Sequence, residues 1–145
     1  MMLKKINTLL KEKDICVLST VSGNSNPHCS LMAYVTDKEC HKIYMLTSRA
    51  TKKFINLKQN PNVSLLIDSR GRPLQDAQAL TVRGLFEPMY NKDKRAAAEA
   101  ILLEKHPHLK DFMDDPETEA ICIKVQSYLL LNGLTDSHYI SLEEG

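Results

Sequence analysis

The chain has 145 residues and a mass of 16.4 kDa, which is the length of one domain with a sizeable core. Apolar residues make up 43% of the chain and charged residues 26%, a composition that excludes a wholly disordered protein. No uncharged apolar run approaches the roughly 20 residues of a membrane-spanning helix. The glycine signatures of dinucleotide-binding folds, P-loop nucleotidases and serine hydrolases do not occur in the sequence.

Charge is distributed unevenly, although the net charge is only +1. Residues 40–67 contain five cations and no Asp or Glu, whereas residues 111–145 contain eight acidic residues and one lysine, a net charge of −7. A protein that binds nucleic acid over a whole face is usually more basic. The distribution therefore favours one local positive pocket for a small anionic ligand, and we interpret the acidic tail as a solvated end of the chain.

The first half of the chain is predicted to begin with a short amphipathic helix over residues 3–12. Strands are predicted over Ile15–Val21, His28–Thr36 and Lys42–Thr47, and the short turns between them predict a three-stranded meander. The segment His28–Thr36 alternates in polarity, and its more apolar face is expected to face the core. That face consists of Cys29, Leu31, Ala33 and Val35.

The second half alternates helices and strands irregularly. The sequence predicts a helix over Thr51–Gln59, then a strand over Val63–Asp68 and a loop over Ser69–Asp76. A strand over Ala77–Glu87 follows, with a bulge or bend at Gly84. The last predicted elements are a helix over Lys92–Glu104, one turn over Leu109–Met113, and strands over Ala120–Leu131 and His138–Leu142. About six strands with two to four peripheral helices predict a mainly β fold. The expected architecture is a single antiparallel barrel over residues 1–145, with helices at its ends.

The segment Thr47-Ser48-Arg49-Ala50-Thr51-Lys52-Lys53 combines three hydroxyls and three cations where a predicted strand leads into a predicted helix. Hydroxyl donors, ammonium groups and the free N–H groups at a helix start are the groups that recognise phosphate. The two lysines lie in the first helical turn, where a cation is unfavourable unless an anion lies nearby. The alternative is a solvated helix start with two ordinary surface lysines.

The run YMLTSRATKKFINLKQNPNVSLLID, preceded by NPHCSLMAYV, resembles the pyridoxamine 5′-phosphate oxidase-like family of FMN-binding split barrels. Thr47, the Lys52-Lys53 pair and Asn60-Pro61 match the family pattern in order and spacing. The resemblance implies a split β-barrel, and it extends over most of the chain. It further implies a two-fold homodimer with FMN near the subunit interface.

By this resemblance, Lys52 and Lys53 would hold the FMN phosphate, with Thr47 and Ser48 assisting from the end of the strand. The segment Ser30, Leu31 and Met32 matches the family strand that lies along the flavin ring and offers backbone groups to it. Lys52 replaces the usual arginine of the phosphate pair, which keeps the charge but loses bidentate geometry.

The C-terminus departs from the family pattern. Pyridoxamine phosphate oxidases carry an Arg-x-His substrate motif there, whereas this chain ends HYISLEEG and has no arginine after Arg95. We therefore expect a flavin-dependent oxidoreductase of a small molecule that is not a true pyridoxamine phosphate oxidase. The alternative is a module that carries flavin, or haem, without turnover, for which His106, His108 and His138 are the candidate haem ligands. A small RNA-binding barrel is disfavoured by the acidic tail.

Four cysteines lie in apolar or strand-like contexts and show no C-x-x-C spacing. They are expected to be reduced thiols of a cytoplasmic protein rather than disulfides or zinc ligands. Cys16, Cys29 and Cys122 alternate with core residues and are expected to pack inside. Cys40 lies in a predicted turn and is expected to be the exposed thiol.

Overall fold

The computed structural model describes residues 2–69 and 77–142. Its helices are α1 (Met2–Glu12), α2 (Lys52–Gln59), α3 (Lys92–Lys105), the short 3-10 turn η2 (Pro107–Leu109) and α4 (Lys110–Asp114). Its strands are β1 (Ile15–Val21), β2 (Pro27–Ala33), β3 (Val35–Thr36), β4 (Lys42–Ser48), β5 (Asn62–Asp68), β6 (Gln78–Glu87), β7 (Thr118–Asn132) and β8 (Asp136–Ser141). The predicted loop Ser69–Asp76 lies, except for Ser69, outside the described residues.

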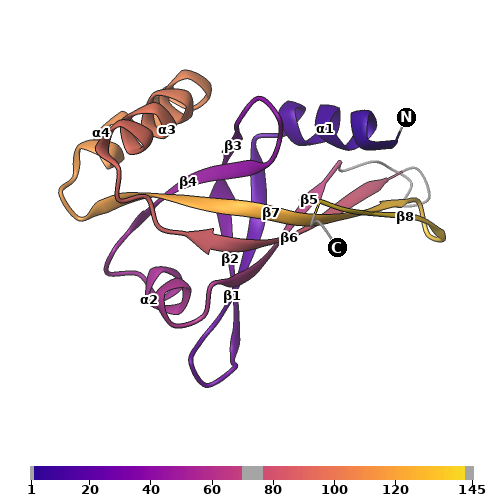
Figure 1. Ribbon diagram of the computed structural model, residues 1–145, viewed down its shortest axis with the longest axis horizontal. Helices are drawn as coiled ribbons and strands as arrows, with labels where there is room; N and C mark the ends of the chain where they lie inside the picture. Colours follow the sequence, from indigo (N-terminus) through magenta and orange to yellow (C-terminus); the bar gives the residue numbers. More distant parts are fainter. Residues whose placement is uncertain (1, 70–76, 143–145) are drawn as a thin grey trace.

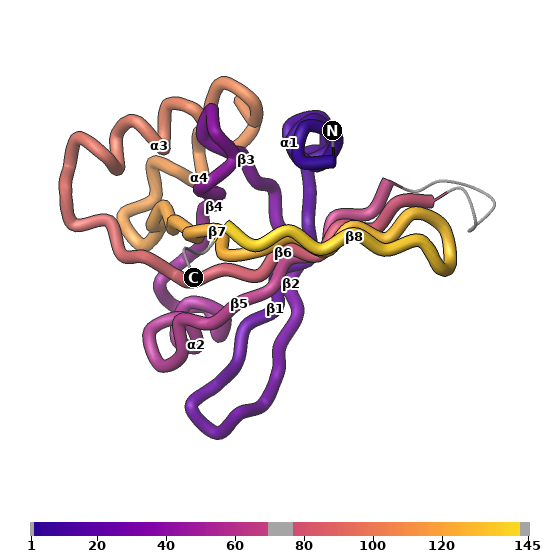
Figure 2. Tube along the Cα trace, turned by 45° about the vertical axis from the view of Figure 1, so that its right-hand side comes forward, coloured from indigo at the N-terminus to yellow at the C-terminus, as the bar shows by residue number. Residues whose placement is uncertain are grey.

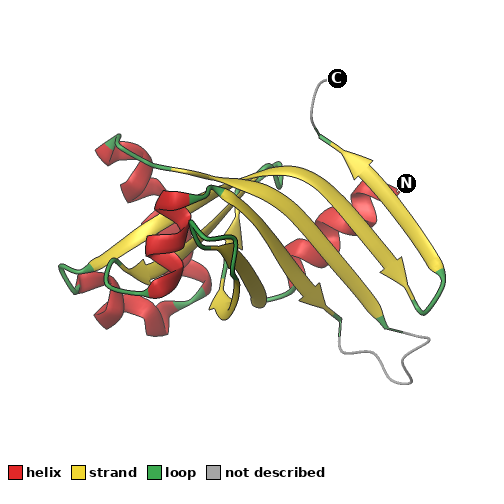
Figure 3. Ribbon diagram, turned by 90° about the horizontal axis from the view of Figure 1, so that it is seen from below, coloured by secondary structure: helices red, strands yellow, loops and turns green. Residues whose placement is uncertain are grey.

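All strands belong to one curled antiparallel sheet, as predicted, with the order β2-β1-β5-β6-β7-β4-β3. The strand β7 is long enough to pair with β6 on one edge and with both β4 and β8, one after the other, on its second edge. Helices α3 and α4 lie near the start of β7, and α1 lies toward its end (Figure 1). Seen from below, the strands curve as a half-barrel with the helices around it (Figure 3).

The predicted meander is wrong, because the segment His28–Thr36 is not one strand. Its backbone bends at Tyr34, so that β2 pairs with β1 while β3 pairs with β4. The two strands on either side of this bend therefore lie at opposite edges of the sheet. Tyr34 is fully buried and anchors the bend by donating its hydroxyl to the carbonyl of Leu10 at 2.6 Å.

The bend also reverses the expected orientation of β2. Met32 and Tyr34 are buried, whereas Leu31 is 67% exposed and Cys29 is exposed as well. Val35 is buried as predicted, but it packs with a second apolar cluster beside α3. Alternation gives the period of a strand but does not say which face is covered, and here the less apolar set of β2 faces the core.

The predicted irregularity at Gly84 is confirmed as a shift of register between β6 and β7 at Arg83/Gly84. A Cβ atom at Gly84 would lie 2.6 Å from Cγ2 of Ile123 and 2.8 Å from the backbone carbonyl oxygen of Lys124. The two strands therefore approach so closely that only glycine fits. The bulge falls where β7 changes partner from β4 to β8.

The main core lies between the inner face of the sheet and helices α1 and α2, and includes Ile6, Leu10 and Phe54. A smaller cluster formed by Val35, Leu46, Leu102 and Ala120 packs α3 against β3, β4 and β7. The β1–β2 hairpin extends past α2 (Figure 2), and its Gly23 amide donates to Oε1 of Gln59 at the end of that helix. Within the described residues, no helix is long and apolar enough to cross a membrane.

The expected exposure of Cys40 is wrong. Its backbone adopts a positive φ of 59°, and the carbonyl of Cys40 accepts a short hydrogen bond from the hydroxyl of Tyr128. The side chain is fully buried, and burial raises the pKa of its thiol. Cys16 and Cys122 are buried as expected, but the expected burial of Cys29 is wrong, because it lies on the exposed face of β2.

Candidate functional site

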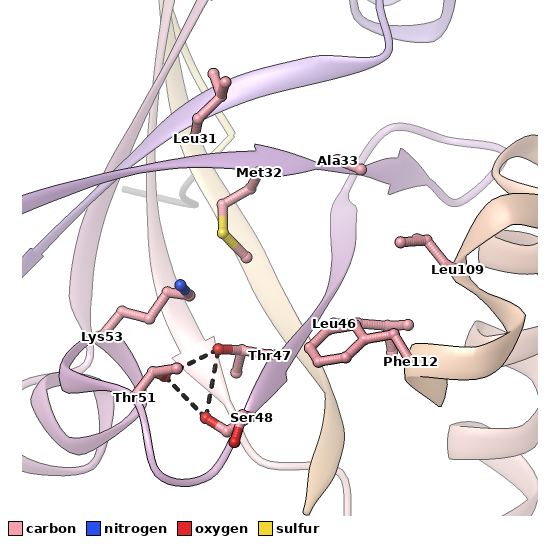
Figure 4. Close-up of a pocket in the computed structure, with 10 residues that line it drawn as sticks. All are labelled: Leu31, Met32, Ala33, Leu46, Thr47, Ser48, Thr51, Lys53, Leu109 and Phe112. Atoms are coloured by element: carbon pink, nitrogen blue, oxygen red, sulfur yellow. Dashed lines mark hydrogen bonds between the residues drawn. The ribbon is translucent and has the colours of Figure 1, made fainter. Parts of the chain in front are cut away.

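A pocket of about 240 Å³ lies where the two edges of the curled sheet approach each other. We call it the edge pocket. It is lined by Leu31, Met32 and Ala33 of β2, Leu46, Thr47 and Ser48 of β4, Thr51 and Lys53 at the start of α2, and Leu109 and Phe112 beyond α3. Figure 4 shows that these residues come from four separate parts of the chain, and that Leu31 points away from the others.

The loop from β4 to α2 forms the polar wall of the edge pocket. The hydroxyl of Thr51 donates to the carbonyl of Ser48 at 2.8 Å and lies 3.0 Å from the hydroxyl of Thr47. Thr51 is also the N-cap of α2, because its side chain accepts a hydrogen bond from the amide of Phe54. These contacts explain why the segment needs hydroxyl residues even without a ligand.

The start of α2 leaves donors free. Among the described residues, no acceptor is bonded to the backbone amides of Lys52 and Lys53, which lie in the first helical turn. No acidic side chain lies in that turn either. The helix therefore presents an uncompensated positive end, which favours an anion.

The two lysines differ in position. Lys53 lines the edge pocket, and its side chain extends between Thr51 and Met32 (Figure 4). Lys52 is exposed and does not belong to the pocket lining. The sequence predicted that both lysines hold the phosphate as a pair, whereas in the structure they lie on different sides of the helix start, one inside the pocket lining and one outside it.

The residues expected along the flavin ring are also only partly brought together. Leu31 and Met32 line the pocket, but Ser30 does not. The side chains of Leu31 and Met32 point to opposite sides of β2, and only Met32 points into the pocket (Figure 4). Within the described part of the chain, β2 pairs only with β1, so its other edge offers unpaired backbone groups on the pocket side.

Two apolar lining residues, Leu109 and Phe112, were not expected from the sequence. They belong to η2 and α4, which follow the long helix α3. Phe112 is exposed although it is a large apolar side chain, and an isolated exposed aromatic residue gives no signal of its function in the sequence. Their place in the pocket depends on the packing of α3 against the sheet.

The histidines considered as haem ligands have other partners. His106 is buried, and its Nε2 lies 2.8 Å from the carbonyl oxygen of Tyr34. A carbonyl only accepts, so this nitrogen must carry the proton and donate. His108 packs edge-to-face on His106, and His138 lies 3.1 Å from a carboxylate oxygen of Asp136. Within the described residues, no cluster of three or more metal-ligating side chains occurs.

A curled antiparallel sheet with a small pocket between β2, β4 and the start of α2 has the architecture of the split-barrel proteins. The model of the family described as pyridoxamine 5′-phosphate oxidase matches residues 2–132. The chain therefore belongs to this family, whose members generally bind a small-molecule cofactor. No curated protein matches the sequence.

Solved structures share the fold at low sequence identity. A haem-binding protein from Mycobacterium smegmatis superposes with a TM-score of 0.87 at 18% identity, covering 97% of this chain and 58% of that chain. General Stress Protein 26 from Bacillus anthracis gives 0.74 at 25% identity, covering 97% and 98%. HutZ, a haem storage protein from Vibrio cholerae, gives 0.73 at 17% identity, covering 85% and 89%. This chain thus spans less than two thirds of the M. smegmatis protein.

Proposed function

We propose that this protein binds FMN in the edge pocket and acts as a flavin-dependent oxidoreductase on a small molecule. The observation that carries the proposal is the meeting of Lys53, the free amides of α2 and the unpaired edge of β2 around one pocket. A flavin mononucleotide has a dianionic phosphate and a flat ring. Lys53 and the free amides of α2 match the phosphate, and the unpaired edge of β2 matches the ring.

The residues fit the phosphate part of the cofactor best. Lys53 lines the pocket with its ammonium, and the first-turn amides of α2 add donors beside it. Ser48 also lines the pocket, and its hydroxyl accepts a hydrogen bond from the amide of Ala50. The hydroxyls of Thr47 and Thr51 are already bonded within the loop, so we assign them to shaping the loop, with any contact to the phosphate secondary. Lys52 would contribute only through its charge at longer range.

The ring would lie along the free edge of β2, near Leu31 and Met32. There, backbone groups can orient it, and Met32 with Phe112 can exclude water from one side. When bound, FMN supplies the hydride and electron transfer, so that no protein nucleophile is required.

The size of the edge pocket supports a homodimer. A pocket of about 240 Å³ is below the roughly 300–1,000 Å³ of sites that enclose a small molecule. One subunit would therefore enclose only part of FMN. A second copy that covers the exposed Leu31 would complete the site.

The outer face of the sheet offers a surface for that second copy. The strand registers align Leu31, Val17, Leu66, Thr81, Leu129 and Tyr139 in one continuous row across six strands, which we call the outer row. Leu66 is 43% exposed, Leu129 42% and Tyr139 61%. Four members of the row, Leu31, Leu66, Leu129 and Tyr139, are exposed apolar side chains, whereas Val17 and Thr81 between them are half-buried. Exposed apolar side chains gathered on one face mark an interaction surface. The row begins at Leu31 on β2, the strand that also lines the edge pocket, so a dimer contact on the row would reach the edge of that pocket.

A titration of the purified protein with FMN, followed by absorbance and flavin fluorescence, tests the proposal. Saturable quenching and a bound flavin spectrum are expected, together with reduction by a nicotinamide donor and reoxidation by a nitroaromatic compound or quinone. A protein that stays indifferent to FMN would refute the binding. Flavin that binds but is neither reduced nor reoxidised would favour the alternative function, a module that carries flavin without catalytic turnover.

Haem is the second candidate, because two of the similar structures are named as haem-binding or haem storage proteins. His106 is already donating to Tyr34 in this fold, which leaves His108 and His138 as the candidate ligands. A Soret band after addition of haemin, lost in His108→Ala or His138→Ala, would favour haem over FMN. A flavin spectrum with no such band is the outcome that we expect.

A further inference from the structure

A second and larger cavity lies on another face of α2. It has a volume of about 710 Å³, and among the residues that the structure describes it shares no lining residue with the edge pocket. Its walls come from α2 and the residues flanking it, from the end of β6 and the segment after it, from Arg95 in the first turn of α3, and from the start of β7. We call it the α2–α3 cavity.

The floor of this cavity is apolar and partly aromatic. Phe54 and Leu57 are buried beneath it, and the ring of Phe54 meets that of Phe86 edge-to-face at 6.5 Å between centroids. At the mouth, Tyr90 is 88% exposed. Water over such a floor is unfavourable, and an apolar ring or chain would displace it with a gain in free energy.

The rim of the cavity is positively charged. Arg49, Lys58 and Arg95 line it against the single carboxylate of Glu119, which leaves an excess of two positive charges. Among the described residues, none of these four side chains belongs to an ion pair. Arg49 does donate to the carbonyl of Pro116, and the ammonium of Lys58 lies 5.3 Å from the Phe54 ring centroid.

Arg95 therefore combines two useful properties: it lines the cavity and has no ion-pair partner in the described part of the chain. Its helix α3 is capped by Asn91, whose side chain accepts from the amides of Asp93 and Lys94. The position of Arg95 is thus fixed by a well-capped helix rather than by a loop. A cation held beside an apolar floor would bind an anionic group more strongly than a free surface lysine does.

We propose that the α2–α3 cavity is a second binding site, for a small amphipathic carboxylate: an apolar ring or chain that ends in one anionic group. Its volume falls within the roughly 300–1,000 Å³ of small-molecule sites. A neutral ligand would leave the cations unpaired, and an inorganic anion would leave the aromatic floor in water. The site is separate from the cofactor site and does not depend on the identity of the cofactor.

The test uses the fluorescent anion 8-anilinonaphthalene-1-sulfonate as the probe and decanoate as the competitor, on the full chain. We expect saturable binding of the probe, displacement by decanoate, and a loss of affinity of about tenfold in Arg95→Gln and in Lys58→Gln, since each removes one charge-assisted contact. Lys92→Gln removes an exposed charge from α3 outside the cavity and is the matched control, with unchanged affinity.

Equal probe affinity in all four proteins, or fluorescence that does not saturate, would overturn the proposal, because the probe would then bind elsewhere. A thermal melt identifies any variant that fails to fold. If Arg95→Gln does not fold, the probe affinity of Lys58→Gln alone tests the proposal. FMN affinity is measured in the same variants and is expected to stay unchanged. Failure of FMN binding in the unmodified protein would refute the cofactor proposal alone.

Discussion

The sharpest prediction separates two adjacent lysines. Replacing Lys53 with glutamine leaves a polar side chain that is one atom shorter and removes the positive charge that lines the edge pocket. The same replacement at Lys52 removes an equal charge from an exposed position outside the lining. If the phosphate of FMN lies in this pocket, only the first change removes a direct contact.

The expected magnitudes follow from the positions. A hydrogen bond to a charged group contributes about 1.5–3 kcal/mol, and about 1.4 kcal/mol corresponds to a tenfold change in affinity. Lys53→Gln should therefore weaken FMN binding by about 10- to 100-fold. Lys52→Gln acts on the phosphate only through solvent, where charges are strongly screened, and should change the affinity less than about threefold.

Quenching of flavin fluorescence gives both dissociation constants, and riboflavin provides an internal control. Riboflavin has the same ring without the phosphate, so its affinity should be nearly the same in the original protein and in Lys53→Gln. Equal losses in the two lysine variants would refute the assignment of the phosphate to this pocket. An equal loss of riboflavin affinity in Lys53→Gln would show that the substitution damages the pocket as a whole.

Three further predictions concern the dimer, the bulge and the buried thiols. Leu129→Lys places a charge in the outer row and should convert a dimer into monomers, as measured by light scattering. Leu134→Lys, at an exposed turn outside the row, should leave the dimer intact. A dimer that survives both changes would exclude the outer row as the dimer interface. Gly84→Ala should lower the free energy of unfolding in urea by about 1–3 kcal/mol, because its Cβ would clash with Ile123 and the backbone, while Gly23→Ala meets only the flexible Gln59 side chain and should cost less. Burial raises the pKa of Cys16 from 9.0 to about 12. Above pH 9 the thiol therefore loses its proton more readily in the unfolded state, and the free energy of unfolding should fall as the pH rises toward 12. The Cys16→Ala variant should lose less stability over this pH range, and an equal loss in the two proteins would argue against the thiol as its origin.

The local elements were predictable because they depend on short-range physics. Asn91 caps α3 and Thr51 caps α2, as residues with side-chain oxygens do. The helix α2 ends before Pro61, and Gly84 marks the bulge. The strand pattern predicted the barrel and the family resemblance its split form, and both the residues and the resemblance pointed to the loop before α2, which does line the edge pocket.

The failures came from long-range packing. The sequence around Tyr34 reads as one alternating strand, and nothing local indicates that its two halves pair with different strands. Once the chain bends there, the side of the sheet that α1 and α2 cover decides which side chains of β2 point into the core. This is why Leu31 is exposed and Met32 is buried. Cys40 was misplaced for a similar reason, since the turn that contains it packs under Tyr128.

The bend at Tyr34 also explains how distant helices shape the edge pocket. Every polar group of Tyr34 is used: its hydroxyl donates to Leu10 of α1, its amide donates to Asp14, and its carbonyl accepts from His106 after α3. Burial raises the pKa of the phenol, which keeps it a donor.

Lys105 strengthens the same junction. Its ammonium donates to the carbonyls of Lys11 and Lys13 at 3.0 and 2.5 Å, beside the end of α1, where a cation is favourable. Helices α1 and α3 thus hold the bend from which β2 and β3 depart to opposite edges of the sheet. Since the edge pocket lies between β2 on one side and β4 with α4 on the other, its width depends on this junction, although neither His106 nor Lys105 touches the pocket.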